Sequence, residues 1–140
     1  MDLDDFLGPR LIVVDLRSES KREAIEELIA HLVAAQKMTA EHKDKISTVV
    51  HKRESAMSTG IGFGIALPHA ATDLVADVVW VVGRSKKGIQ FDAPDGKPVN
   101  LVMLFLVPTG QFQMHANTLA NIAKFLHRED FRDGLRHRFM

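Results

Sequence analysis

The chain has 140 residues, 46% of them hydrophobic, which suffices for one core but not for two domains of ordinary size, so we expect a single domain over residues 1–140. Its 18 basic side chains equal its 18 acidic ones, so no overall charge would draw it to nucleic acid. Cysteine is absent, which excludes disulfides, thiolate metal sites and a cysteine nucleophile.

No apolar segment is long enough to insert into a membrane. The longest run, residues 101–107, has seven residues, whereas a spanning helix needs about 20. Asp2, Asp4 and Asp5 stand where a signal peptide would carry basic residues. We therefore expect a cytoplasmic protein.

The first third of the chain alternates between strand-like and helix-like patterns. Residues 11–16 predict a short buried strand, and Ser20 with Glu23 predicts a capping box at the start of a helix. This helix has one apolar face, formed by Ala24, Leu28, Ile29 and Leu32. Thr39 is expected to cap a second helix that ends near Arg53. The apolar positions of this second helix are Ile46, Val49 and Val50.

The remaining elements follow in the same alternation. Residues 64–67 and 77–84 predict two strands, and residues 94–96, Pro-Asp-Gly, predict a turn. Residues 101–107 are apolar at consecutive positions, as expected for a central strand buried on both faces. A third helix is expected over residues 113–127, with an inward face of Leu119, Ile122, Ala123 and Leu126. Strands interleaved with helices predict an α/β sandwich in which helices flank a central mixed β-sheet.

The segment from Ser58 to His69 carries the strongest chemical signal. Its three alternate glycines, between residues 60 and 64, permit backbone conformations closed to other residues and let a ligand approach the main chain. Pro68 then restricts the chain, so His69 leaves the segment in a defined direction and is a candidate nucleophile. The glycine spacing fits neither a dinucleotide fingerprint nor a phosphate-binding Walker loop. The residues alone leave a plain alternative open, a glycine-rich hairpin with His69 on its surface.

Residues 58–69 resemble the active-site segment of the IIA phosphocarrier domains of the phosphoenolpyruvate:sugar phosphotransferase system, of the mannitol/fructose type and most closely of the nitrogen-regulatory branch. Arg53 stands five residues before Ser58, where that family carries its active-site arginine. Residues 88–99, followed by an apolar run, are similar to the family's second hallmark. His115 matches the third, a histidine that opens a helix.

The resemblance extends over almost the whole chain, from about Leu3 to the last residues. Two features depart from the family pattern. Members usually carry glycine where Ala70 stands, and they usually continue past the position of residue 140 with a further helical segment.

The resemblance implies a mannitol/fructose-type IIA fold and a phosphoryl relay. His69 would accept the phosphoryl group on its Nε2 atom from a phosphohistidine of the carrier protein HPr or its nitrogen-branch counterpart. His115 would hydrogen-bond the transferring group, while Arg53, Ser58 and Thr59 would supply further donors to the phosphoryl oxygens. No metal and no cofactor is required.

The residues by themselves support these roles less directly. His115 lies near the expected start of a helix, where backbone amides favour negative charge, but a solvated histidine fits the same position. Arg53 would also serve as a residue near a helix end that interacts with the last carbonyls. The other five histidines show no metal-ligand spacing and are expected to be solvated: His31, His42, His51, His127 and His137.

Three functions follow from this reading. In the first, a phosphocarrier passes the phosphoryl group from His69 to a IIB partner or keeps it as a regulatory mark. In the alternative, the chain is a regulatory binding module of the nitrogen phosphotransferase system that has no IIB acceptor and contacts a target protein according to its phosphorylation. A hydrolase or metal-dependent enzyme built on His69 and His115 lacks a third ligand or a general-base carboxylate.

Overall fold

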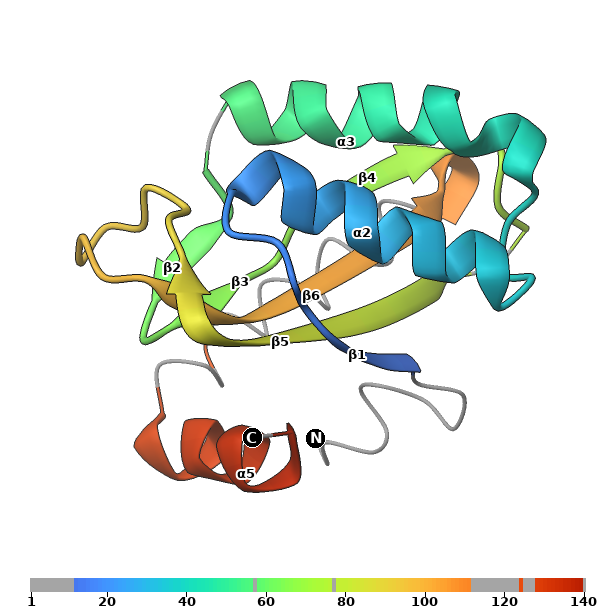
Figure 1. Ribbon diagram of the computed structural model, residues 1–140. Helices are drawn as coiled ribbons and strands as arrows, with labels where there is room; N and C mark the ends of the chain where they lie inside the picture. Colours follow the sequence, from blue (N-terminus) through green and yellow to red (C-terminus); the bar gives the residue numbers. More distant parts are fainter. Residues whose placement is uncertain (1–11, 57, 77, 112–123, 125–127, 140) are drawn as a thin grey trace.

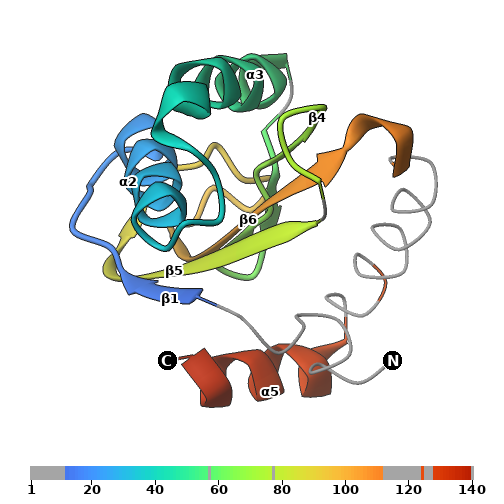
Figure 2. The ribbon, with the colours of Figure 1, turned by 90° about the vertical axis from the view of Figure 1, so that its right-hand side faces the viewer.

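A six-stranded mixed sheet forms the centre of the fold (Figure 1). The computed structural model describes residues 12–56, 58–76, 78–111, 124 and 128–139. The strands follow the order β1-β5-β6-β3-β2, and β4 also pairs with β6. Helices α2 and α3 lie on one side of the sheet and α5 lies on the other (Figure 1, Figure 2). The α/β sandwich with a central mixed sheet, expected from the sequence, is confirmed.

The central strand of this sheet is β6. The strands are β1 Ile12–Asp15, β2 Gly60–Gly62, β3 Ile65–Ala66, β4 His69–Thr72, β5 Val79–Ile89 and β6 Val99–Pro108. Strand β6 runs antiparallel to β5 and parallel to both β3 and β4. Residues 101–107 are all buried, which confirms the prediction of a strand covered on both faces. Strand β5 continues to Ile89, well past the expected Arg84, with an irregular register between the two.

Helix α2, Lys21–Ala34, begins where the sequence predicted. The Ser20 Oγ accepts a hydrogen bond from the Glu23 backbone N–H at 3.2 Å and so satisfies one of the amides left unpaired at a helix start. Its buried stripe consists of Ala24, Ile25, Leu28, Ile29 and Leu32. These side chains belong to one core with β5 and β6, to which Val81 and Leu104 contribute.

The start of α3 corrects one sequence prediction. A short 3₁₀ turn, Ala40–His42, precedes α3, Lys43–Ala56, and Thr39 makes no side-chain capping bond. The Thr39 carbonyl instead accepts the His42 backbone N–H at 3.1 Å, so the turn itself supplies the partner.

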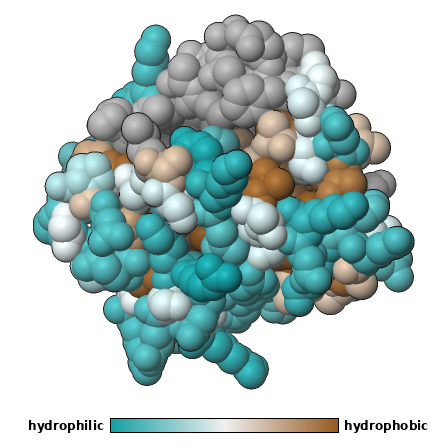
Figure 3. Space-filling view, turned by 90° about the horizontal axis from the view of Figure 1, so that it is seen from above, coloured by the Kyte–Doolittle hydropathy of each residue, from teal (hydrophilic) through white to brown (hydrophobic). Residues whose placement is uncertain are grey.

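The end and the outer face of α3 also differ from expectation. The helix continues to Ala56 instead of ending near Arg53. Val49 is 38% exposed, because Ile46 and Val50, four residues apart, already occupy the buried stripe. Viewed from the side of α2 and α3, the surface is mostly hydrophilic (Figure 3).

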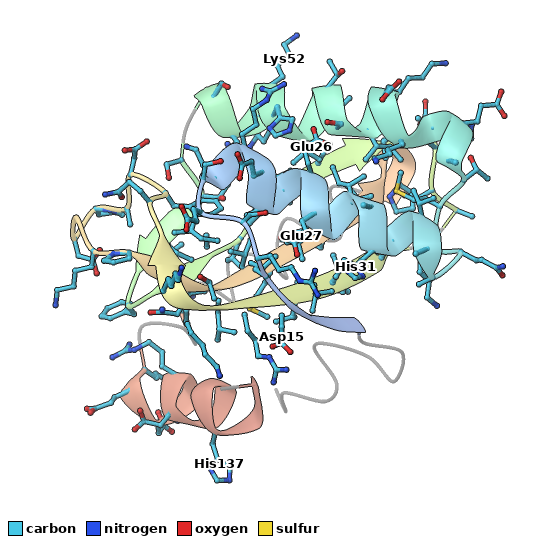
Figure 4. All side chains as sticks on the ribbon, in the orientation of Figure 1. Asp15, Glu26, Glu27, His31, Lys52 and His137 are labelled. Carbon is cyan, nitrogen blue, oxygen red and sulfur yellow. The ribbon has the colours of Figure 1, made fainter. Side chains whose placement is uncertain are left out.

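Two neighbouring acids of α2 connect it to different elements (Figure 4). Glu26 accepts a hydrogen bond from the Ser47 hydroxyl of α3 and lies 2.8 Å from His51 Nε2. Glu27 accepts from the Ser18 hydroxyl at 2.6 Å, in the segment that follows β1. The expectation that His51 is solvated is wrong, since its ring is largely buried and paired with Glu26.

The last part of the chain contains a helix that the sequence analysis did not expect, α5, Glu129–Phe139. The predicted third helix over residues 113–127 lies outside the described residues, apart from the helical Lys124. None of the helices in the described ranges is long and apolar enough to cross a bilayer.

Candidate active site

His69 is the first residue of β4, and the sheet explains how it is placed. Ile65 of β3 pairs with Leu101 of β6, and His69 pairs with Phe105, so both short strands follow one register along β6. Pro68 separates β3 from β4, because it has no N–H to donate to the hydrogen-bond ladder of the sheet. Its carbonyl still accepts the Phe105 N–H at 3.1 Å.

The imidazole of His69 projects toward the α5 side of the sheet. Successive residues of a strand point to opposite faces. The next residue, Ala70, belongs to the core shared with α2 and α3. The His69 ring therefore lies on the other face, where it stacks on the Phe105 ring with centroids 4.9 Å apart.

A single hydrogen bond determines which nitrogen of the His69 ring carries the proton. Its Nδ1 atom lies 2.8 Å from the Leu67 carbonyl oxygen. Because a carbonyl oxygen only accepts, Nδ1 carries the proton and donates it. In the neutral ring Nε2 is then the unprotonated nitrogen, whose lone pair can act as a nucleophile.

The surroundings keep this ring neutral. Burial lowers the pKa of His69 below its ordinary 6.5, and the positive charge of Arg53 lowers it further. The Leu67 carbonyl and the Glu54 carboxylate act in the opposite direction, but the lowering effects prevail. The imidazole is thus available as a nucleophile at neutral pH.

Sequence reasoning missed Glu54, which ties the last turn of α3 to the start of the glycine-rich segment. Its carboxylate is buried, accepts the Thr59 backbone N–H at 3.0 Å and the Thr59 hydroxyl at 2.6 Å, and lies 3.6 Å from Lys21 Nζ. A signal was present, because an acid in the last turn of a helix opposes the helix dipole and needs a specific partner.

The hydroxyls of Ser58 and Thr59 are both engaged within the protein. Ser58 donates to the Phe91 carbonyl and accepts the Gly60 N–H at 3.2 Å. Thr59 is buried and donates to Glu54. Neither hydroxyl proton is available to a phosphoryl group in this arrangement, so either bond would have to be exchanged during transfer. In the structure, the hydrogen bonds of both residues stabilise the conformation of the loop.

The glycine-rich segment forms the β2–β3 hairpin. Gly62 and Gly64 have φ angles of 88° and 78°, in the region that favours glycine. At Gly60 a Cβ would meet the Ala93 Cβ at 3.0 Å, so the absent side chain permits a close approach to the 91–95 segment. The plain alternative was right about the hairpin, but His69 is not a simple surface residue.

Asp95 and Arg132 both contact Phe63 at the tip of the β2–β3 hairpin. The Asp95 carboxylate accepts the Phe63 N–H at 3.1 Å and the Lys97 N–H at 3.0 Å. Gly96 N–H donates to the Ala93 carbonyl at 2.9 Å, which confirms the predicted turn. The Arg132 guanidinium of α5 lies 3.7 Å from the Phe63 ring centroid.

Of the predicted site residues, Arg53 lies near enough to His69 for its charge to act on the imidazole. Thr59, which follows Ser58, is joined to the segment before His69, since its carbonyl accepts the Leu67 N–H at 3.1 Å. His115 lies outside the described residues. Among the side chains that the structure describes, no three His, Asp or Glu groups gather in a way that could hold a metal ion.

Comparison with known proteins agrees with this geometry. Residues 5–138 match the family model of the phosphoenolpyruvate-dependent sugar phosphotransferase system, EIIA 2. The chain belongs to this family, and the resemblance noted from residues 58–69 is confirmed. It is therefore a IIA component of a phosphotransferase system.

Individual relatives come from both branches of the family. The fructose-specific EIIA component of Haloferax volcanii is 34% identical over 134 residues, which cover 96% of this chain and 86% of the relative. The nitrogen regulatory protein IIA-Ntr of Neisseria meningitidis superposes with a TM-score of 0.77 at 31% identity, covering 89% of this chain and 83% of the other. A solved complex of mannitol enzyme IIA with phosphorylated enzyme IIB from Escherichia coli shares the fold, with a TM-score of 0.67 at 22% identity and coverage of 89% and 83%.

Proposed function

We propose that this IIA component carries the phosphoryl group on Nε2 of His69. The observation that carries the proposal is the hydrogen bond from Nδ1 to the Leu67 carbonyl, which leaves Nε2 as the nucleophilic nitrogen. Burial and the charge of Arg53 support it by lowering the pKa of the ring. Family membership supports phosphoryl transfer as the chemistry.

In the proposed transfer, bonds, electron pairs and protons balance without a metal ion. The Nε2 lone pair attacks phosphorus as the bond between phosphorus and the donor's imidazole nitrogen breaks, with the two nitrogens in line. The donor nitrogen keeps the electron pair and leaves as neutral imidazole, because the other nitrogen of the donor ring holds a proton. Nδ1 of His69 keeps its own proton on the Leu67 carbonyl throughout.

Arg53 is the proposed partner of the phosphoryl oxygens. Its guanidinium offers a planar set of donors that matches those oxygens, and its charge already acts on His69. Ser58 and Thr59 would contribute only after exchanging their bonds to Phe91 and Glu54.

His115 is proposed to hydrogen-bond the group during transfer without carrying it. Loss of one preorganised donor commonly slows a reaction about 10²-fold to 10³-fold, so His115→Ala should still become phosphorylated at His69, but slowly. Rapid-quench labelling by the upstream carrier measures this rate. Labelling at the unaltered rate, or a phosphoryl group on His115 of the native protein, contradicts the role.

The donor that we propose is a phosphohistidine of an HPr-like carrier protein, in the cytoplasm, with residues 1–140 acting as one domain. A IIB domain is the proposed acceptor if the chain serves sugar transport, as the fructose-specific relative and the complex with phosphorylated enzyme IIB suggest. The likeness to IIA-Ntr supports the alternative, a regulatory module that contacts a target protein according to its phosphorylation.

A reconstituted relay tests the carrier role. The chain is incubated with phosphoenolpyruvate, enzyme I and HPr, and the intact mass is followed. Wild type and His31→Gln, which alters an exposed histidine of α2, should each gain one phosphoryl group, and His69→Gln should gain none. Stoichiometric labelling of folded His69→Gln, or no labelling of wild type by HPr or its nitrogen-branch counterpart, overturns the proposal.

A second step separates the two uses of the phosphoryl group. The labelled chain is mixed with a fructose-type IIB domain, whose cysteine is the acceptor in that branch. Transfer of the label at a rate comparable to that from a fructose-specific IIA favours the transport role. Retention of the label favours the regulatory module.

A further inference from the structure

Three aromatic rings from adjacent strands stand at one level of the sheet. Trp80 of β5 pairs in register with Phe105 of β6, and Phe105 pairs with His69 of β4. Directly paired residues on neighbouring strands point to the same face, a strand spacing apart. Trp80, Phe105 and His69 thus form a row across the sheet, on the face opposite to α2 and α3.

The three rings of this row are stacked. The imidazole and the Phe105 ring have centroids 4.9 Å apart and planes within 10° of parallel. The Phe105 and Trp80 rings have centroids 4.5 Å apart and planes inclined by 25°. Phe105 is only 2% exposed, so the backbone and its neighbours hold its ring firmly.

We propose that Phe105 is a positioning residue for His69, an inference that rests on the proposed phosphocarrier function. The side-chain torsions of a histidine on a strand leave its imidazole two freedoms. The ring plane can tilt, and the ring can flip so that the Nδ1 and Cδ2 positions exchange. The face of Phe105 fixes the plane, and the Leu67 carbonyl fixes which edge carries Nδ1. Together they define the direction of the Nε2 lone pair, which lies in the ring plane.

This direction matters because transfer between two imidazoles is in line. The lone pair must point at phosphorus opposite the departing nitrogen, and small errors in alignment slow such reactions strongly. Phe105 is buried and so is not expected to form part of the surface that binds the carrier. Removing its flat face should lower the turnover rate and leave the KM for the phosphorylated carrier unchanged.

The test compares three substitutions in β6. Phe105→Leu keeps an apolar side chain but removes the aromatic face, while Phe105→Tyr keeps the face. Met103→Val is the matched control, since Met103 is equally buried, lies on the same face two residues away and loses a similar volume. The emission of Trp80, the single tryptophan of the chain, reports whether the row is disturbed in each variant.

Phosphorylation of each variant by the upstream carrier is measured across carrier concentrations. We expect the turnover rate of Phe105→Leu to fall by roughly ten- to hundredfold with an unchanged KM, as for a misaligned reacting group. Phe105→Tyr and Met103→Val should stay within about threefold of wild type. Equal slowing by Met103→Val, or no slowing in Phe105→Leu, overturns the proposal.

A second readout needs no phosphoryl donor. The ¹⁵N NMR shifts of the His69 ring should report one tautomer, with the proton on Nδ1, in wild type and Met103→Val. In Phe105→Leu they should report a mixture of tautomers, because a ring that is free to tilt no longer keeps its hydrogen bond to the Leu67 carbonyl. A single unchanged tautomer in Phe105→Leu contradicts the inference even if transfer is slow. Failure of wild type to accept a phosphoryl group would instead refute the proposed function, while the tautomer result would still report on ring orientation.

Discussion

At the scale of single residues, the proposed phosphoryl transfer depends on which ring nitrogen of His69 carries the proton. The Leu67 carbonyl assigns it to Nδ1, and burial with the charge of Arg53 keeps the ring neutral. Neither the tautomer nor the lowered pKa could be predicted from the glycine-rich pattern. The tautomer depends on a backbone carbonyl, and the pKa depends on how deeply the ring is buried in the fold.

The His69 ring should titrate below pH 6.5 in an NMR pH series. Since the neutral ring is the proposed nucleophile, the rate of phosphorylation should decline only at a lower pH than expected for a histidine of ordinary pKa. Arg53→Gln removes a charge that disfavours protonation, so it should raise the pKa. Lys52→Gln, which alters the exposed neighbour seen pointing away from the sheet in Figure 4, should leave it unchanged. An unshifted pKa in Arg53→Gln contradicts the assignment.

Glu54 should matter for stability although it is not proposed to touch the phosphoryl group. Glu54→Gln replaces an ionised acceptor of two Thr59 bonds by an amide that accepts through one oxygen, beside Lys21. We expect a loss of about 2 kcal/mol in the free energy of unfolding, typical of a buried charged group that loses bonding. Urea denaturation measures it, with Glu41→Gln as the exposed control. Equal stability of the two variants refutes the role.

At the scale of elements, β3 and β4 behave as one strand that Pro68 divides. After Pro68, β4 begins with His69, which pairs with Phe105. On the other side of β3, the β2–β3 hairpin lies close to the 91–95 segment. The position of His69, the proposed nucleophile, is therefore set by the pairing of β4 with the central strand β6 and by the close approach of the β2–β3 hairpin to the 91–95 segment.

Gly60 is where this closeness can be tested. Gly60→Ala should destabilise the protein and slow phosphorylation, because its Cβ would lie 3.0 Å from the Ala93 Cβ. Gly134→Ala in α5 should raise stability by up to about 1 kcal/mol, because among the described residues only the chain neighbours and the helix's own backbone come within 4 Å of the added Cβ. Thermal unfolding and labelling of both variants provide the comparison. A Gly60→Ala variant as stable and as fast as wild type would show that the close approach is unimportant.

At the scale of the whole molecule, hydrophobic periodicity was enough to predict the sandwich. The apolar run of β6, the Ser20 cap of α2 and the turn before β6 each follow from local physics, and all three are confirmed. The charged helix α5 does carry apolar residues at helical spacing, Phe131, Leu135 and Phe139, and this pattern was overlooked. Thr39 and Val49, by contrast, depend on a 3₁₀ turn and on the rotation of α3, which tertiary packing decides.

The site could be predicted only in part. The glycines and Pro68 pointed to His69, and an acid in the last turn of α3 was a local signal for Glu54. The stacking of Phe105 on His69 joins two strands that are distant in the sequence, which no local pattern reveals. That residues 1–140 form one domain and that His115 assists transfer stay predictions.

The central claim is that the phosphoryl group resides on Nε2 of His69. The most direct measurement is an NMR experiment that correlates phosphorus with the ¹⁵N nuclei of the His69 ring after phosphorylation by the upstream carrier. We predict coupling of phosphorus to Nε2, with Nδ1 still protonated on the Leu67 carbonyl. Coupling to Nδ1, or to any residue other than His69, would contradict the account.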